Sequence, residues 1–230
     1  MNVFANKRHT NSVHHNHNIL FDDITLQEVD KVKLLGLHVD KHLRWDFHVN
    51  HVCQKISSGL YALRRMSFIS TLETLKLVYF SFIHSHISFG ISLYGGTTQH
   101  NLNRILVLQK QAVRVMLRLK WHESVKEHFA NLGIFTVFSL YIYETIMHVR
   151  KNDKDLQTLG FNHEYNTRNK SKLLFPQHKL KFFEKKPSYV GIRFLYGLPD
   201  DIRNEQNIVK FKKLLKSYLL ATPLLFSMSL

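Results

Sequence analysis

The stretch NLNRILVLQKQAVRVMLRLKW, from Asn101 to Trp121, decides most of the fold that we expect for this chain. At about 100° per residue, its large apolar side chains fall on one helical face. That face consists of Leu102, Ile105, Leu106, Val113, Met116 and Leu117. Four cations fall in a sector on the opposite side, namely Arg104, Lys110, Arg114 and Arg118. Two interpretations stay open: a solvated stripe on an ordinary amphipathic helix, or a surface that meets negative charge.

The segments on either side of this stretch show the same helical periodicity and are separated by short loops. The pattern predicts helices over 47–66, 70–93, 123–132 and 136–150. Asp46 is the expected N-cap of the first helix, Ser70-Thr71 opens the second, and Gly133 ends the third. The packed face of the first helix is expected to be Val49, Val52, Ile56, Leu60 and Leu63. Successive helices with short connections indicate an all-α bundle.

The two ends of the chain differ from this bundle. Residues 19–39 contain short apolar runs typical of strands, and Gly36, inside the run 32–39, indicates a bulge or a close approach of another backbone. Beyond Lys151 the chain is polar and basic, with short helices expected over 189–198 and 207–220. The last helix is expected to pack through Ile208, Phe211, Leu214, Leu215 and Tyr218. The fold class is therefore mainly α, with a small N-terminal β hairpin, a helical bundle and a mixed basic C-terminal extension.

Composition points to a polyanionic partner. The chain has 230 residues, is 44% hydrophobic, and carries a formal net charge of +15. The hydrophobic fraction is large enough to form a buried core. The net positive charge makes the folded chain repel itself, and folding does not require so much of it. Nucleic acid is the first partner to consider and an anionic membrane surface the second. The lone cysteine, Cys53, excludes a disulfide within the chain and the cysteine-based zinc motifs.

A membrane span and a histidine metal site are the less favoured alternatives. The segment Leu77–Tyr94 is long enough to span a bilayer, but serines and histidines interrupt it, so a buried bundle helix is the better interpretation. His84 and His86 lie two apart on a helix, so their rings point in different directions. The histidines of residues 1–20 lack periodicity and indicate a polar loop. The N-terminus lacks a signal-peptide apolar run, so we expect an intracellular protein of the nucleus or cytoplasm, not secreted and not in a membrane.

Taken in order, four stretches resemble the C-terminal part of the reverse transcriptases of jockey-like non-LTR retrotransposons. They are Val32–Asp40 with Leu43–Trp45, Leu60–Arg65, His84–Gly90 with Tyr94-Gly95, and Leu108–Arg114. Leu140–Glu144, Asn166–Arg168 and Gly197–Asp200 fit the same pattern. The likeness covers residues 28–220, and its ordered series is more specific than any one motif.

The resemblance implies a part of a hand-shaped polymerase. Residues 1–45 would be a remnant of the palm, residues 46–150 a thumb-like helical bundle, and residues 151–230 a basic C-terminal extension. The turn Leu35-Gly36 sits where the family has its primer-gripping hairpin. The implied partner is a template–primer duplex or an RNA–DNA hybrid. The cations expected to contact its phosphates are Lys55, Arg64, Arg65, Lys110, Arg114 and Arg118, although a solvated surface charge stays open for each.

The resemblance does not extend to catalysis. Nucleotide addition needs two divalent metals clamped by several carboxylates. The family supplies these carboxylates upstream of the Leu-Gly segment, and Phe21-Asp22-Asp23 is better interpreted as a turn. No catalytic residue, metal site or cofactor is therefore expected in this chain, and magnesium only in the complete family enzyme. The predicted function is template–primer gripping by a fragment that does not polymerise; the alternative is an inactive helical interaction or structural remnant.

Overall fold

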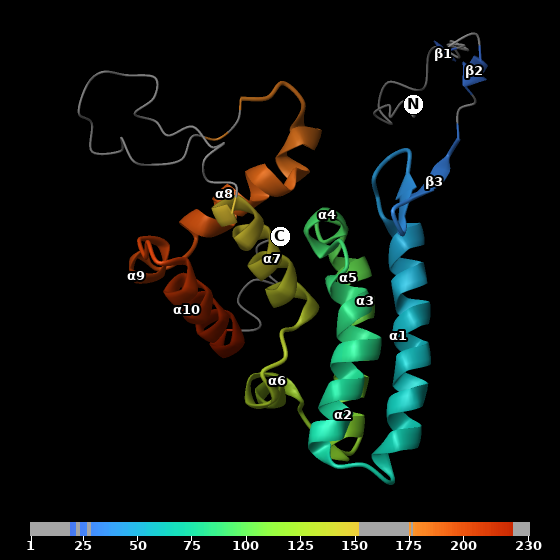
Figure 1. Ribbon diagram of the computed structural model, residues 1–230, viewed down its shortest axis with the longest axis vertical. Coiled ribbons are helices and arrows are strands. Elements are labelled where there is room, and N and C mark those ends of the chain that lie inside the picture. Colours follow the sequence, from blue (N-terminus) through green and yellow to red (C-terminus); the bar gives the residue numbers. More distant parts are fainter. Residues whose placement is uncertain (1–18, 22–23, 27–28, 152–174, 176, 223–230) are drawn as a thin grey trace.

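The computed structural model of the protein describes residues 19–21, 24–26, 29–151, 175 and 177–222. Within these residues the chain is mainly helical, and two short antiparallel hairpins precede the first helix (Figure 1). The expected fold class is therefore confirmed. The histidine-rich start, the proposed turn at Asp22-Asp23 and the stretch Asn166–Arg168 lie outside the described residues.

The strands form two separate hairpins. β1 (Ile19–Phe21) pairs with β2 (Ile24–Leu26), and β3 (Lys31–Leu34) pairs with β4 (Leu37–Asp40). Of the two alternatives predicted for Gly36, the bulge is wrong, because the run 32–39 contains a two-residue turn at Leu35-Gly36. Both turn residues have positive φ, 47° and 84°. This conformation matches the right-handed twist of the flanking strands, and glycine adopts it without strain.

The helix α1 (Asp46–Ser67) confirms its predicted packing face. Val49, Val52, Ile56, Leu60 and Leu63 are all buried. The predicted N-cap is wrong, because Trp45 holds that position with a φ of 68° and Asp46 is already helical. The Asp46 carboxylate instead accepts a hydrogen bond from Asn101 Nδ2 at 2.8 Å, which ties α1 to α5 (Gln99–Leu117).

The single helix expected over 70–93 is broken into several pieces. They are α2 (Leu72–Tyr79), a π-helical stretch (Phe80–His84), α3 (Ser85–Ser88) and α4 (Ile91–Tyr94). Its start is as predicted, because the Thr71 side chain caps α2 by accepting from the Thr74 N–H. The chain turns at Gly90, which has a φ of 69°. The segment Leu77–Tyr94 therefore consists of short helical pieces packed in the bundle rather than one continuous helix.

The helix α5 lies against α1 and confirms most of its predicted apolar face. Five of the six predicted residues are buried, and Leu117 is half-buried. The cations do not share one open face, because α1 covers part of the opposite side. Arg104 Nη2 donates to Asn50 Oδ1 at 2.7 Å, and Arg118 Nη2 donates to the Ser67 carbonyl at 2.8 Å. Both arginines therefore join the two helices.

A fully buried amide lies in the middle of the apolar face of α5. Gln109 Nε2 donates to Tyr79 Oη at 3.0 Å and to the Phe135 carbonyl at 3.2 Å. Gln109 Oε1 accepts from the N–H of Val137 at 2.8 Å, and Val137 is the first residue of α7 (Val137–Lys151). The side chain thus satisfies one of the N–H groups that a helix start leaves free. It connects α2, α5 and α7 through one polar centre.

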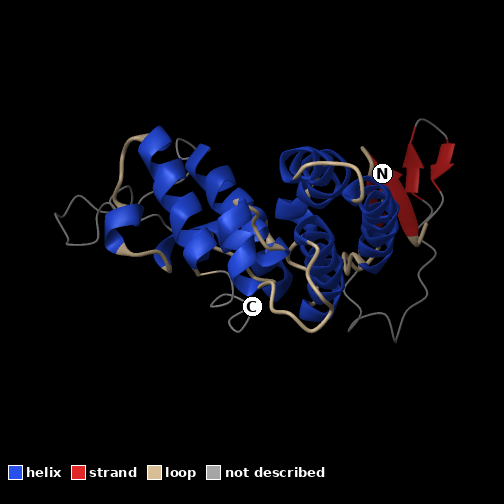
Figure 2. Ribbon diagram, turned by 90° about the horizontal axis from the view of Figure 1, so that it is seen from below, coloured by secondary structure: helices blue, strands red, loops and turns tan. Residues whose placement is uncertain are grey.

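The remaining helices are α6 (Lys126–Leu132), α8 (Pro187–Tyr196), α9 (Asp200–Arg203) and α10 (Ile208–Ala221), with a 3-10 turn at Lys181–Lys185. Of these, α8 and α10 pack against α7, and α9 packs against α10. Gly133 ends α6 with a φ of 68°, as predicted. Figure 1 places α7 between the α1–α5 group and the group formed by α8, α9 and α10, and Figure 2 shows the strands on the outer side of α1.

One cluster of buried side chains runs through the structure, from Val49 on α1 to Leu219 on α10. The packing face predicted for α10 is only partly right. Phe211 and Leu215 are buried, whereas Ile208 and Leu214 are 41% and 42% exposed. The helix is rotated so that Leu219 takes part in the core, and its lysines lie on the exposed side.

Candidate nucleic-acid interface

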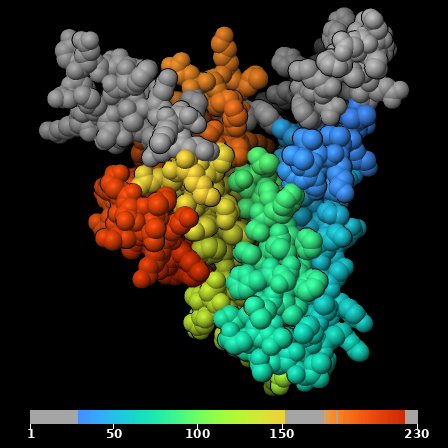
Figure 3. Space-filling view, in the orientation of Figure 1, coloured from blue at the N-terminus to red at the C-terminus, as the bar shows by residue number. Residues whose placement is uncertain are grey.

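The Leu35-Gly36 turn packs against the helical bundle. A Cβ atom on Gly36 would lie 3.2 Å from Phe89 Cε1, so the turn lies directly on the junction between α3 and α4. The Leu35 side chain nevertheless stays 86% exposed. In Figure 3 the blue hairpin adjoins the end of α1 and the green region that contains α4. In the predicted primer-grip-like turn, Gly36 therefore packs against the bundle while the Leu35 side chain is exposed to solvent.

A buried carboxylate anchors this hairpin to α1. Asp40, the last residue of β4, is 7% exposed. Its Oδ2 accepts from the N–H of Trp45 at 2.8 Å, and its Oδ1 accepts from the N–H groups of His42 and Arg44 at 3.0 and 3.2 Å. Hydrogen bonds to a carboxylate are stronger than those between neutral groups. Asp40 therefore fixes the direction in which the chain passes from the hairpin into α1.

Basic side chains gather where the hairpin meets α1 and α3. Lys33 and His38 are cross-strand partners, and partners of this kind share one face of a hairpin. The His38 ring lies 4.8 Å from the His51 ring on α1. Burial first, and then the positive charges of its neighbours, lower the pKa of His51. The neighbours are His38, Lys55, Lys33 and His86. We call these five residues the hairpin basic cluster.

The hairpin basic cluster contains no acidic residue, and neither of its lysines forms a salt bridge with another described residue. Two large apolar side chains lie exposed nearby, Leu35 at the turn and Phe89 at 54%. The combination of unbalanced positive charge with an exposed ring is suited to a backbone phosphate and an adjacent sugar or base.

A buried histidine lies beneath the cluster. His48 is 2% exposed, and its Nδ1 accepts from the N–H of His38 at 3.5 Å. Its ring lies 4.7 Å from the ring of Tyr94. Burial, followed by the charges of His38 and His51, lowers the pKa of His48 to about 4. The imidazole is therefore neutral at pH 7, and the folded chain resists its protonation.

This histidine predicts a loss of stability in acid. Between the ordinary pKa of 6.5 and the folded value of about 4, the unfolded chain takes up a proton on His48 that the folded chain does not. The free energy of unfolding should therefore fall as the pH drops through this window. In His48→Gln, urea unfolding between pH 7 and 4.5 should show a pH slope reduced by about one proton. The exposed His100→Gln is the control, and an unchanged slope in His48→Gln would contradict the assignment.

The other predicted cations of α1 lie at its far end. Arg64 and Arg65 are exposed in the last turn, with the exposed rings of Tyr61 just before that turn and Phe68 directly after the helix. Arg118 reaches the same end through its hydrogen bond to the Ser67 carbonyl. Nine residues of helix, about 14 Å, separate Arg64 from Lys55. The structure therefore brings only Lys55 of the predicted residues into the hairpin basic cluster.

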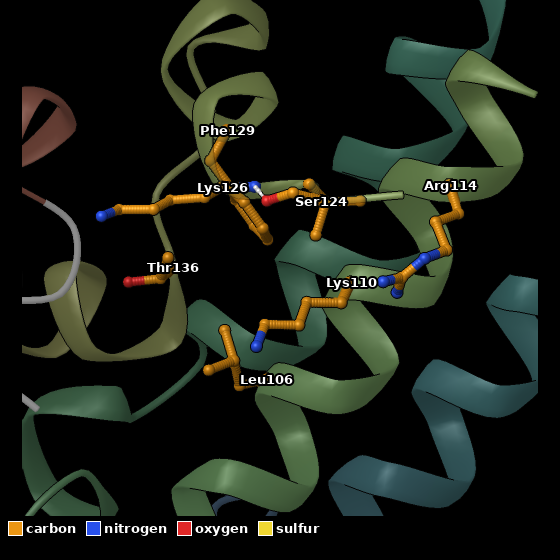
Figure 4. A pocket seen from close by; sticks show the side chains of 8 residues that line it. Leu106, Lys110, Arg114, Ser124, Lys126, Phe129 and Thr136 are labelled. Atoms are coloured by element: carbon orange, nitrogen blue, oxygen red, sulfur yellow. Dashed lines mark hydrogen bonds between the residues drawn. The ribbon is translucent and has the colours of Figure 1, made fainter. Parts of the chain in front are cut away.

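Lys110 and Arg114 lie in a third place, between α5 and the segment that leads into α6. They line a pocket of about 150 Å³, shown in Figure 4. The other lining residues are Leu106, Ser124, Val125, Lys126, Phe129 and Thr136. Arg114 Nη2 donates to the Glu123 carbonyl at 3.2 Å. The six cations predicted from the sequence are thus divided among three surfaces.

Sequence reasoning missed most of the hairpin basic cluster. Lys33 and His38 are equally far from the Leu35-Gly36 turn, so a hairpin with a two-residue turn pairs them. A single strand with a bulge at Gly36 does not bring them together. His51 and His86 have no linear signal, because they come from different helices. Lys126, opposite the predicted pair on α5, was missed for the same reason.

Within the described part of the chain, no three His, Cys, Asp or Glu side chains meet in a way that could hold a metal ion. None of the described helices is by itself long and apolar enough to cross a membrane, and only α6 and α7 taken together, with a bend of 46° between them, meet the length and composition required. Comparisons with protein-family models, with curated proteins and with solved structures found no match to this chain.

Proposed function

We propose that this chain binds the backbone of a template–primer duplex, such as an RNA–DNA hybrid, and does not polymerise by itself. The observation that supports this most strongly is the hairpin basic cluster, which brings Lys33 of the hairpin and Lys55 of α1 close to the same imidazole, His51, with no salt bridge from either lysine to a described residue. Phosphates are the natural counter-charge, because neutralising them releases condensed counterions and gives affinity without reading sequence.

The likeness to retrotransposon reverse transcriptases supports the same proposal from the sequence. In that interpretation the Leu35-Gly36 turn is the primer-gripping hairpin, and α1 and α5 belong to the thumb. The turn and the thumb-like helix share one basic surface through Lys33 and Lys55. Gripping needs only such a surface, whereas polymerisation needs metal-binding carboxylates that we do not assign to this chain. A nucleic-acid partner also fits a location in the nucleus or cytoplasm.

Salt dependence tests the phosphate contacts. If three phosphates are neutralised, the affinity for a labelled RNA–DNA hybrid should fall about 40-fold between 50 and 200 mM salt. In the double variant Lys33→Gln, Lys55→Gln, the slope of log affinity against log salt should decrease in magnitude by about 2. The matched control is Lys212→Gln, Lys213→Gln, two exposed lysines of α10, which should leave the slope unchanged.

Three results would contradict this function. Equal affinity at both salt concentrations would exclude a grip through phosphates. Equal loss of slope in both double variants would assign binding to diffuse charge rather than to the hairpin basic cluster. A chain that unfolds cooperatively but binds no hybrid at 50 mM salt would favour the structural remnant.

A further inference from the structure

The pocket beside α5 is separate from the hairpin basic cluster. Its walls are apolar where Leu106, Val125 and Phe129 line it, and basic where Lys110 and Arg114 reach it from α5 (Figure 4). These two cations are four residues apart, so successive turns place them on the same side of the helix. No acidic side chain lines the pocket. It therefore combines an apolar wall with concentrated positive charge.

The polar groups of this pocket have unused hydrogen-bonding capacity. Arg114 Nη2 donates to the Glu123 carbonyl, but its Nε is buried and has no hydrogen-bond partner within the described residues. Lys110 makes no hydrogen bond or ion pair with any other described residue. The Ser124 hydroxyl oxygen accepts from the N–H of Lys126 at 3.3 Å and keeps its own hydrogen to donate.

A buried donor without a partner costs free energy, and an anion with several acceptor oxygens removes that cost. Figure 4 shows the Lys110 and Arg114 head groups on the pocket side, while the Lys126 ammonium points away from them. Lys110 and Arg114 therefore form the contact site, and Lys126 contributes charge at a distance. Two cations on the same side of a helix match a compact dianion better than a singly charged carboxylate or phosphodiester.

We propose that this pocket binds a phosphomonoester, with the phosphate on Lys110, Arg114 and Ser124 and the group that carries it against Phe129. A volume of about 150 Å³ accommodates a phosphate and a small ring, but not a duplex. The same chemistry has two sources, a free small phosphomonoester or the terminal 5′-phosphate of a nucleic-acid strand. The pocket does not depend on the proposed grip, since none of its residues belongs to the hairpin basic cluster.

The first test is calorimetric titration of the full chain with phenyl phosphate at pH 7.5 and low salt. We expect saturable one-to-one binding, weaker binding of the monoanion phenyl sulfate, and a loss of affinity of roughly tenfold in Lys110→Gln. Lys110 holds no structural contact, so this variant should fold, and circular dichroism checks it. Lys213→Gln on α10 is the matched control and should bind as the parent chain does. Absence of saturation up to about 10 mM phenyl phosphate, or unchanged affinity in Lys110→Gln, would overturn the proposal.

The second test identifies the source of the phosphate. Single strands of one sequence, with a 5′-phosphate or a 5′-hydroxyl, are compared at equal salt. Tighter binding of the phosphorylated strand that Lys110→Gln abolishes assigns the pocket to strand ends, and equal binding of both strands assigns it to free phosphomonoesters. The Lys33→Gln, Lys55→Gln variant should still bind phenyl phosphate, so failure of the grip and failure of the pocket are distinguishable.

Discussion

Replacing Gln109 by leucine is expected to lower the free energy of unfolding by about 3–5 kcal/mol, because it leaves three buried polar groups without partners. These groups are the Tyr79 hydroxyl, the Phe135 carbonyl and the N–H of Val137. All three residues are buried, so water does not replace the lost amide. The N–H of Val137 is also a helix-start donor that no residue of α7 can satisfy.

The matched control for this prediction is Gln111→Leu, two positions further along α5. Gln111 is half-buried and makes none of these contacts, so its replacement should change stability by less than about 0.5 kcal/mol. Urea unfolding followed by circular dichroism measures both variants. A double-mutant cycle with Tyr79→Phe should recover a coupling of about 1 kcal/mol, because the Gln109–Tyr79 bond is lost in either single variant. A loss below about 1 kcal/mol in Gln109→Leu would show that the polar centre does not stabilise the bundle.

Replacing Gly59 by alanine is expected to cost about 1–3 kcal/mol, although alanine is the better helix former by about 1 kcal/mol. The new Cβ would lie 2.7 Å from the Phe82 carbonyl oxygen and 3.0 Å from Ile83 Cγ1. The Phe82 oxygen belongs to the backbone of the π-helical stretch, so the clash is relieved only by separating α1 from that stretch. Lys55 lies on α1, and His86 lies on α3, which directly follows the π-helical stretch. The same separation should therefore move the two residues apart and lower the affinity for an RNA–DNA hybrid.

The control for this prediction is Ser58→Ala, on the exposed side of α1 next to Gly59. Its hydroxyl bonds only to the carbonyl of Gln54 one turn earlier, so alanine should be neutral or slightly stabilising through helix propensity. Thermal and urea unfolding of the two variants are compared under identical conditions. If Gly59→Ala were as stable as Ser58→Ala, the close approach of α1 to Phe82 would not exist in solution.

The features that could be predicted from the sequence are those that depend on near neighbours along the chain. The apolar faces of α1 and α5 follow from helical periodicity, since the residues that pack are three or four apart. The caps at Thr71 and Gly133 follow from local backbone chemistry. Gln109 also lies in the apolar sector of α5. Helical periodicity places it in the core but does not indicate which groups its amide contacts.

The break between Phe80 and Gly90 could not be predicted, because it depends on packing against residues that are distant in the sequence. The π-helical stretch lies against Gly59, which is more than twenty residues away in sequence. The same limit applies to Arg118. Its place on α5 suggested an outward charge, and only the docking of α1 shows that it donates to the Ser67 carbonyl.

The sequence by itself determined a mainly helical bundle with a basic surface, because periodicity and net charge are properties of the chain. Which cations share a surface was decided only by the tertiary structure. Lys33, His38, His51, Lys55 and His86 come from three separate segments, and they meet because Asp40 directs the hairpin onto α1 and Gly36 lets its turn approach Phe89. Charge at one point depends on distances in space, and the order of residues along a chain does not contain those distances until the helices have packed.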